Sequence, residues 1–296
     1  MDLTPAHRGE HAVRTLVRRV LLALLTIVAG GFLSATLVRY APGFGSDERQ
    51  LDSRLSHESL VIIRHETSAQ GNVVAYYAGY LRRMAHGDLG YSRLLNRPVR
   101  ELLAERARVT ARMVGEGMGI AWMAALLLAV AVWWFSTPAL EVLLTVFSGG
   151  LLCLPAAGVA LLSVVLNQAG YLAIAIVVFP KVFRYLSSLI ATTHAMPHIV
   201  TAEAKGISRS RVFFCHVLPV VDREVLALAG VSLGLAISAA IPVEALCGIP
   251  GVGQLAWQSA MGRDLPLLTQ IAILVVACVT LANSGADLLG EGRRSI

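Results

Sequence analysis

Long apolar runs separated by short polar segments dominate the pattern of hydrophobic and polar positions along the chain. Several runs reach about 20 residues, which is long enough for a helix to cross a hydrocarbon core about 30 Å thick. The runs are continuous, whereas strands of a membrane barrel would alternate with a period of two residues. Because lipid offers no partners for backbone hydrogen bonds, the runs must form helices. The pattern predicts an all-α, polytopic membrane protein.

Six spans are expected, at residues 17–39, 110–134, 139–165, 169–190, 224–243 and 266–289. Only LNQAG (166–170) separates the third span from the fourth, which also contains Pro180 and Arg184. A proline is tolerated in a membrane helix where neighbours satisfy the freed carbonyl. The first span follows several arginines without a strong cleavage site, so we interpret it as a retained signal anchor.

Basic residues in the short segments predict the orientation. They are Arg8, Arg14, Arg18, Arg19, Lys205, Arg209, Arg211, Arg223, Arg293 and Arg294. With six spans, these residues share one side, which the positive-inside rule makes the cytoplasm. We therefore expect a cytoplasmic segment 1–16, a first span 17–39, an extracytoplasmic loop 40–109, a membrane core 110–290 and a cytoplasmic tail 291–296.

Composition and charge narrow the classes of function. Charged residues make up 15% of the chain, against about 25% in soluble proteins. The net charge of +6 is explained by arginines that flank membrane helices, so we expect lipid and no nucleic acid as a partner. The four scattered cysteines form no CxxC pair and no disulfide framework is expected.

A possible catalytic motif is GVSLG (230–234), which matches the G-x-S-x-G pattern of serine hydrolases. The motif lies inside an apolar run, and all eight histidines precede Ser232 without entering the interior of a span. A nucleophilic serine needs a base, usually histidine. The small residues 230–239 are better explained by close helix packing. An intramembrane hydrolase that uses Ser232 remains the alternative.

Metal and nucleotide motifs are incomplete in this sequence. HESLV (His57) and HETSA (His65) lack the second histidine of H-E-x-x-H, and GIPGVG (248–253) lacks the lysine and hydroxyl residue of a P-loop. We expect no metal, no cofactor and no ATP site, and we interpret GIPGVG as a tight loop. Glu116 and Glu244 adjoin apolar spans, where a carboxylate faces either an aqueous path or the headgroups.

The most polar insert between spans is TAEAKGISRSRVFFCHVLP (201–219). Its pattern predicts a helix that ends at Gly206 in the left-handed conformation, then a second helix capped by Ser208 and stopped by Pro219. An apolar stripe is expected at Val212, Phe213, Val217 and Leu218. Such a hairpin either rests on anionic headgroups or docks in a groove of a cytoplasmic protein.

The spacing of Ala202, Gly206 and Leu218–Pro219 resembles the EAA loop of ABC-importer permeases. TAEAKGIS is similar to the TARAKGLS form of the dipeptide, oligopeptide and nickel permease family. VRYAPG (38–43), GDLGYS (87–92) and EALCGIPGVGQLAWQSAMGRDLP (244–266) resemble further segments of that family in the same order, so the resemblance covers almost the whole chain. The departures from the family pattern include Val200, Glu203, His216 and the uncharged WWFSTPAL (133–140).

The resemblance implies a permease subunit in a bacterial-type inner membrane, with peptides as the default cargo. It implies a second homologous permease, two cytoplasmic ATPase subunits and an extracytoplasmic binding protein as partners. The loop at about 194–219 would couple to the ATPases, through Ala202, Glu203, Lys205, Gly206, Arg209, Leu218 and Pro219. Glu244, Glu116 and Ser232 are candidates for a gate or pore. A non-transporting membrane scaffold is a further alternative.

Overall fold

The computed structural model describes residues 5–40, 73–92, 94–135, 137–262 and 264–292. The expected outer turn after residue 40, both HE motifs at His57 and His65, and the tail arginines lie outside these residues. The chain divides into two units. The first comprises Met1–Glu105 and Leu255–Ala277, and the second comprises Arg106–Gln254 and Cys278–Ile296.

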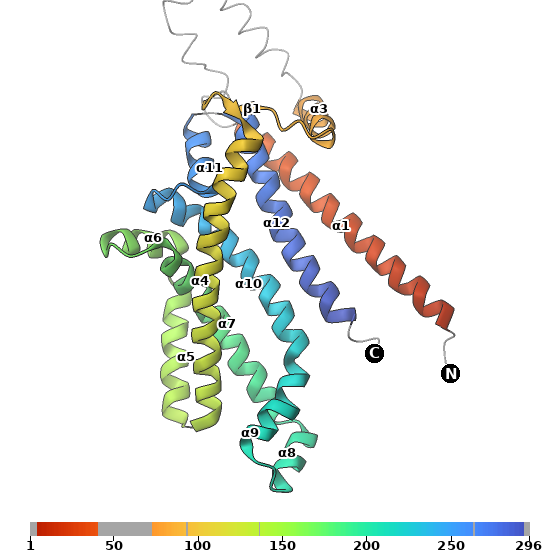
Figure 1. Cartoon of the computed structure of the whole chain (residues 1–296), viewed down its shortest axis with the longest axis vertical. Helices are drawn as coiled ribbons and strands as arrows, with labels where there is room; N and C mark the ends of the chain where they lie inside the picture. Colours follow the sequence, from red (N-terminus) through yellow and green to blue (C-terminus); the bar gives the residue numbers. More distant parts are fainter. Residues whose placement is uncertain (1–4, 41–72, 93, 136, 263, 293–296) are drawn as a thin grey trace, which may run out of the picture. The chain divides into compact units, whose positions relative to one another are not determined.

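The described elements are almost all helices (Figure 1). They are α1 (Pro5–Tyr40), α3 (Val73–Ala85), α4 (Val99–Phe135), α5 (Pro138–Leu152), α6 (Ala156–Val165), α7 (Gly170–His194), α8 (Pro197–Ala204), α9 (Arg209–Val212), α10 (Leu218–Cys247), α11 (Val252–Met261) and α12 (Leu265–Gly292). A π-helical segment, η2 (Phe213–Val217), joins α9 to α10. Two short antiparallel strands, β1 (Tyr91–Ser92) and β2 (Arg97–Pro98), form a hairpin. The predicted all-α class is confirmed.

Four helical stretches of the described chain are long and apolar enough to cross a membrane: Val99–Phe135, Gly170–His194, Arg209–Cys247 and Pro266–Gly285. The bent pair α5 and α6 adds a fifth if it counts as one span. The apolar part of α1, Val20–Ser34, is shorter than these. The predicted polytopic membrane class is therefore confirmed, and the expected first span rests on this shorter stretch of α1.

The span expected at 139–165 consists of two helices, α5 and α6, with an angle of 94° between them. The break occurs at residues 153–155, where Pro155 is the N-cap of α6 with an extended backbone. Proline has no N–H to donate and pushes the residue before it away from helical angles. The apolar run continues through the break, which is why hydrophobicity alone did not reveal it.

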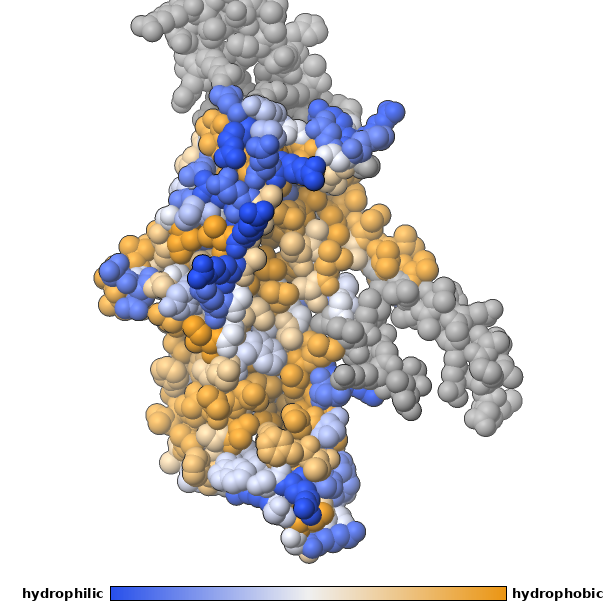
Figure 2. All heavy atoms as spheres, viewed as in Figure 1, coloured by the Kyte–Doolittle hydropathy of each residue, from blue (hydrophilic) through white to orange (hydrophobic). Residues whose placement is uncertain are grey.

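Close helix contacts form the core of the second unit, where α10 packs along α7 and α6, and α5 packs along α7. A Cβ atom on Gly117 would lie 2.7 Å from the Cβ of Ile174, so α4 and α7 approach closely there. Gly234 similarly faces Val279 at 3.3 Å, as expected for the small residues 230–239. The outer face of α5 is apolar and more than half exposed, which suits contact with lipid (Figure 2).

Asp264 holds the hairpin of the first unit. Its Oδ2 accepts hydrogen bonds from Ser92 Oγ at 2.6 Å and from the Leu94 N–H at 3.1 Å. Its Oδ1 accepts from the Leu267 N–H at 3.3 Å, so the same carboxylate caps the N-terminus of α12. Asp264 is 2% exposed, which makes it a buried link between the hairpin and α12.

Asp264→Ala is expected to lower the free energy of unfolding by about 2–3 kcal/mol, because it removes a helix cap and leaves the buried Ser92 hydroxyl without an acceptor for its hydrogen. The thermal midpoint of the purified protein, followed by fluorescence, would measure this. Asp88→Ala is the matched control, since Asp88 is exposed and accepts a local bond from the Gly90 N–H at 2.9 Å. Equal midpoints for the two variants would contradict the role given to Asp264.

Candidate functional site

The segment of residues 197–219, here called the α8–α9 segment, turns sharply at Gly206. Gly206 has a φ of +77°, as predicted for the position after a helix. Its N–H donates to the Glu203 carbonyl at 2.8 Å, and the Ile207 N–H donates to the Ala202 carbonyl at 3.3 Å. These two bonds form a Schellman motif, which satisfies carbonyls at the end of α8. Ala202 is buried, whereas Glu203, Lys205 and Gly206 are exposed.

The prediction that Pro219 stops the second helix is wrong. The chain is helical from Arg209 to Cys247, a stretch of 39 residues. The π-helical turns of η2 end with the Leu218 N–H bonded to the Phe213 carbonyl, five residues back. Pro219 therefore lies in the first turn of α10, where a missing N–H costs little.

Ser208 occupies the predicted N-cap position of α9, and its backbone carbonyl accepts from the Val212 N–H at 3.0 Å. The side chain makes no capping bond in the described structure. Of the predicted apolar stripe, Val212, Phe213 and Val217 are buried, but Leu218 is 44% exposed. The first three residues of the stripe therefore pack in the core, and Leu218 lies at the surface.

Arg209 contacts the end of α4. Its Nη1 donates to the Trp134 carbonyl at 2.9 Å, and its Nη2 donates to the Trp133 carbonyl at 3.0 Å. The guanidinium carbon also lies 5.0 Å from the centre of the Trp133 ring, at cation–π distance. A cation at the C-terminal end of a helix interacts favourably with the helix dipole. This contact spans 75 residues of sequence and was not predicted.

Two further contacts join the α8–α9 segment to neighbouring helices. Glu203 Oε2 lies 3.8 Å from Nε2 of His194, the last residue of α7. The rings of Trp133 and Phe213 are 5.2 Å apart, and Trp133 also packs edge-on against His194 at 5.8 Å. The polar surface of this segment lies at one end of the second unit, below the apolar surface of α5 (Figure 2).

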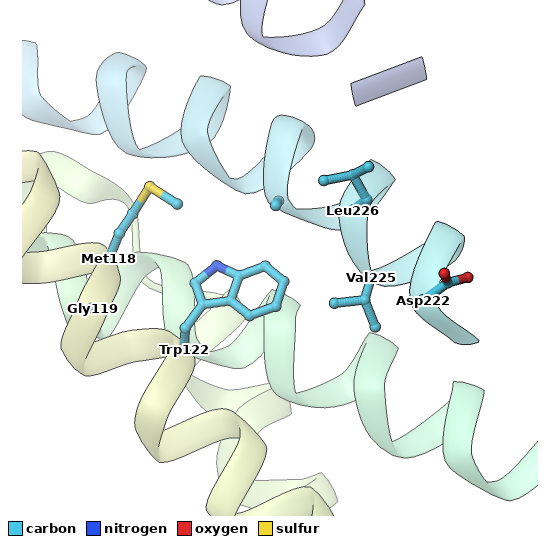
Figure 3. Close-up of a pocket in the computed structure, with 7 residues that line it drawn as sticks. Met118, Gly119, Trp122, Asp222, Val225 and Leu226 are labelled. Carbon is cyan, nitrogen blue, oxygen red and sulfur yellow. The ribbon is translucent and has the colours of Figure 1, made fainter. Parts of the chain in front are cut away.

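Of the pore candidates, Glu116 lines a hollow in the second unit, and Ser232 bonds to a residue that lines another. Glu116 is exposed and pairs with Arg112 at 2.8 Å, at the edge of a hollow of about 550 Å³. Trp122 lines a hollow of about 440 Å³ between α4 and α10 (Figure 3). Its Nε1 donates to Ser232 Oγ at 3.1 Å. Both hollows border Gly119, whose position leaves open space where a Cβ would lie.

Ser232 is buried, and its hydroxyl donates to the Ala229 carbonyl at 3.0 Å. Both of its described contacts are structural, and none involves a base. Among the residues with described positions, no three His, Cys, Asp or Glu side chains gather as they would around a metal ion.

Glu244, the third pore candidate, is fully buried near the C-terminal end of α10. Its Oε2 accepts from the Gly253 N–H at 2.6 Å, in the first turn of α11. Beside it, Thr110 Oγ1 accepts from the Val252 N–H at 2.9 Å, which links α4 to the same turn. The carboxylate therefore lies where α10 and the start of α11 meet.

The glycines of GIPGVG (248–253), here called the glycine motif, explain this arrangement. Gly248 ends α10 with a φ of +67° and donates to the Glu244 carbonyl. A Cβ on Gly251 would overlap the Glu244 carboxyl group, and one on Gly253 would lie 2.6 Å from Ile241 Cα. The predicted tight loop is confirmed, and it leads into α11, a helix that was not predicted.

Residues 117–294 match the protein family described as binding-protein-dependent transport system inner membrane component. The match covers more than half of the chain and includes both the α8–α9 segment and the glycine motif. The chain belongs to this family. As an inner membrane component, it is a multi-pass membrane protein, in agreement with its apolar helices.

Two relatives of this inner membrane component extend the similarity over nearly its full length. The oligopeptide transport system permease protein OppB of Salmonella typhimurium is 28% identical, over 94% of this chain and 96% of that protein. The protein of the same name from Escherichia coli is also 28% identical, with the same coverage of both chains. The resemblance identified from sequence motifs is thereby confirmed at the level of the family.

Trp133 and Thr110 are the site residues of this inner membrane component that sequence reasoning missed. Trp133 was noted only as part of WWFSTPAL, whose lack of charge was identified as a departure from the family pattern. That departure could have indicated the contact, because a helix whose last turn has no basic residue is stabilised by a cation from another element. Thr110 gave no comparable signal, since a threonine at the start of a span is unremarkable in composition.

Proposed function

We propose that the chain is the permease subunit of an ATP-driven ABC importer of peptides. Its family and the oligopeptide permeases that resemble it over nearly their full length support this proposal. The chain would form half of the translocation pore, beside a second homologous permease. ATP hydrolysis would belong to two cytoplasmic partner subunits.

The α8–α9 segment is the observation that carries the proposal. A segment that transmits force needs a fixed shape, and this one combines a short helix, a Schellman turn and contacts to α4 and α7. Glu203 and Lys205 are exposed and are available for polar contacts with an ATPase subunit. Exposed Phe214 and Leu218 would add apolar contact area. This combination favours docking to a protein over resting on lipid headgroups.

The proposed topology has six spans, with both termini and the α8–α9 segment in the cytoplasm. It counts the apolar part of α1 as the first span and the bent pair α5–α6 as the third. The distribution of arginine and lysine supports this orientation through the positive-inside rule. A cysteine introduced at Lys205 should then react with a membrane-impermeant maleimide only in inside-out vesicles.

The outer loops would contact the extracytoplasmic binding protein. In the first unit, Tyr91, Leu94, Trp257 and Met261 are all more than 40% exposed. Large apolar side chains at a polar rim are typical of protein contacts. Glu116, which borders a hollow beside Gly119, is the better gate candidate among the carboxylates. The buried Glu244 would instead hold the outer loop in shape.

Reconstitution of the full complex tests the proposal. The chain, its second permease and both ATPases would be placed in proteoliposomes with the binding protein and a labelled peptide mixture. ATP-dependent accumulation of peptide is the expected result, and an ATPase mutant unable to hydrolyse ATP should abolish it. A complex that assembles without accumulating any solute would favour the scaffold. Ser232→Ala is expected to leave accumulation intact, unlike the result for a hydrolase that uses this serine.

A further inference from the structure

We propose that Arg209 is a positioning residue that fastens the α8–α9 segment to the C-terminal end of α4. Movement of the segment would then displace α4 directly, in addition to α10, with which the segment is continuous. The inference rests on the proposed function, because it assigns a path for motion within a transporter. It also reassigns Arg209, which the family resemblance places on the surface that contacts the ATPase.

The hydrogen bonds of Arg209 attach α9 to the C-terminal end of α4. The last carbonyls of any helix lack partners within the helix, and α4 ends at Phe135. The two Nη atoms of Arg209 reach two of these carbonyls, at Trp133 and Trp134, with distances of 3.0 and 2.9 Å. α4 has no basic residue in its own last turn. Arg209 thus supplies from α9 the cation that α4 lacks.

The Trp133 side chain connects the contact between Arg209 and α4 to two further elements, α7 and η2. It is 8% exposed and lies 5.0 Å from the guanidinium carbon of Arg209. Its ring also contacts His194 at the end of α7 and Phe213 at the start of η2. The end of α4 is therefore enclosed by the end of α7 and by η2, which is part of the α8–α9 segment itself.

The position of α4 gives the contact a consequence for transport. Met118 and Trp122 of α4 face Val225 and Leu226 of α10 across the hollow of about 440 Å³ (Figure 3). Trp122 lies three helical turns before Trp133 on the same helix. A displacement at the Arg209 contact would therefore change the width of this hollow.

Measuring uptake and ATP hydrolysis together in the reconstituted complex tests the inference. Arg209→Ala is expected to lower peptide taken up per ATP hydrolysed by about tenfold or more, because hydrogen bonds to a charged group contribute more than neutral ones. The KM for ATP should stay unchanged, because the nucleotide site is in another subunit. For Arg209→Lys, the peptide taken up per ATP hydrolysed should lie between the values for wild type and Arg209→Ala, because an ammonium group cannot make the paired hydrogen bonds of a guanidinium group. Arg211→Ala, at an exposed arginine two residues away, is the matched control and should behave as wild type.

Three outcomes would overturn the inference. One is an unchanged ratio of uptake to hydrolysis in Arg209→Ala. Another is a parallel fall of both rates, which is the result expected if Arg209 docks the ATPase. If Arg209→Ala does not assemble, the ratio is measured in Arg209→Lys and in Trp133→Leu, and wild-type values in both would overturn it. Absence of uptake by the wild-type complex would instead refute the proposed function.

Discussion

Gly206→Val is expected to abolish most transport while leaving the complex assembled in the membrane. Gly206 has a φ of +77°, and among the described residues nothing lies within 4 Å of where its Cβ would be. The obstacle is thus the backbone angle and not a lack of space. A β-branched residue in the left-handed region costs about 2 kcal/mol or more, which corresponds to a roughly thirtyfold loss of the native turn. The initial rate of ATP-dependent peptide uptake would measure the effect.

Gly206→Asn is the control for this variant, because asparagine enters the left-handed region far more readily than valine. It should retain most of the wild-type uptake, while Gly206→Ala should fall between the two. Co-purification of the ATPase subunits would show whether the variants still assemble. A wild-type rate of peptide uptake by Gly206→Val would contradict the proposal that the turn transmits force.

Gly251→Ala is expected to destabilise the protein by about 3–5 kcal/mol, because the new methyl group would displace a buried carboxylate from its hydrogen bonds. The Cβ would overlap the Glu244 carboxyl group, whose Oε2 accepts from the Gly253 N–H at 2.6 Å. Glu244 is completely buried, so its carboxylate cannot move into solvent unless the C-terminal end of α10 opens. Yield after size-exclusion chromatography and the thermal midpoint would both fall.

Gly248→Asn provides the matched control in the same motif. Gly248 has a φ of +67° with open space around its Cβ position in the described structure, so asparagine should cost about 1 kcal/mol or less. A double variant adds a stricter test. Glu244→Ala removes the group that Gly251→Ala would strike, so the combined loss should be smaller than the sum of the single losses. Strict additivity, or a stable Gly251→Ala protein, would contradict the close contact.

The sequence predicted those features of the fold that depend on local chemistry. Continuous apolar runs indicated the membrane helices, and the glycine of TAEAKG indicated the left-handed turn that the structure has at Gly206. Two prolines were misjudged or overlooked because their effect depends on context. Pro219 was expected to end a helix, but the π-helical turn before it makes it an N-terminal residue of α10. Pro155 lies within an apolar run, and it accompanies the 94° bend.

The remaining site contacts depend on distances that no local pattern contains. Arg209 binds carbonyls 75 and 76 residues earlier in the chain, and backbone carbonyls carry no side-chain signature. The burial of Glu244 follows from Gly251 and Gly253, which were identified only as turn residues. A carboxylate followed at seven and nine residues by glycines is a weak pattern, but it is the one that could have indicated a buried acid.

The unbroken helix from Arg209 to Cys247 has a mechanical consequence. At 1.5 Å per residue its 39 residues extend about 58 Å, nearly twice the thickness of a hydrocarbon core of about 30 Å. Arg209 and Glu244 are therefore near opposite ends of one continuous helix, which can move as a rigid arm. If the arm pivots near its middle, each degree of tilt moves each end by about 0.5 Å, by simple geometry on that length. A rotation of about ten degrees would shift each end by roughly the pitch of one helical turn.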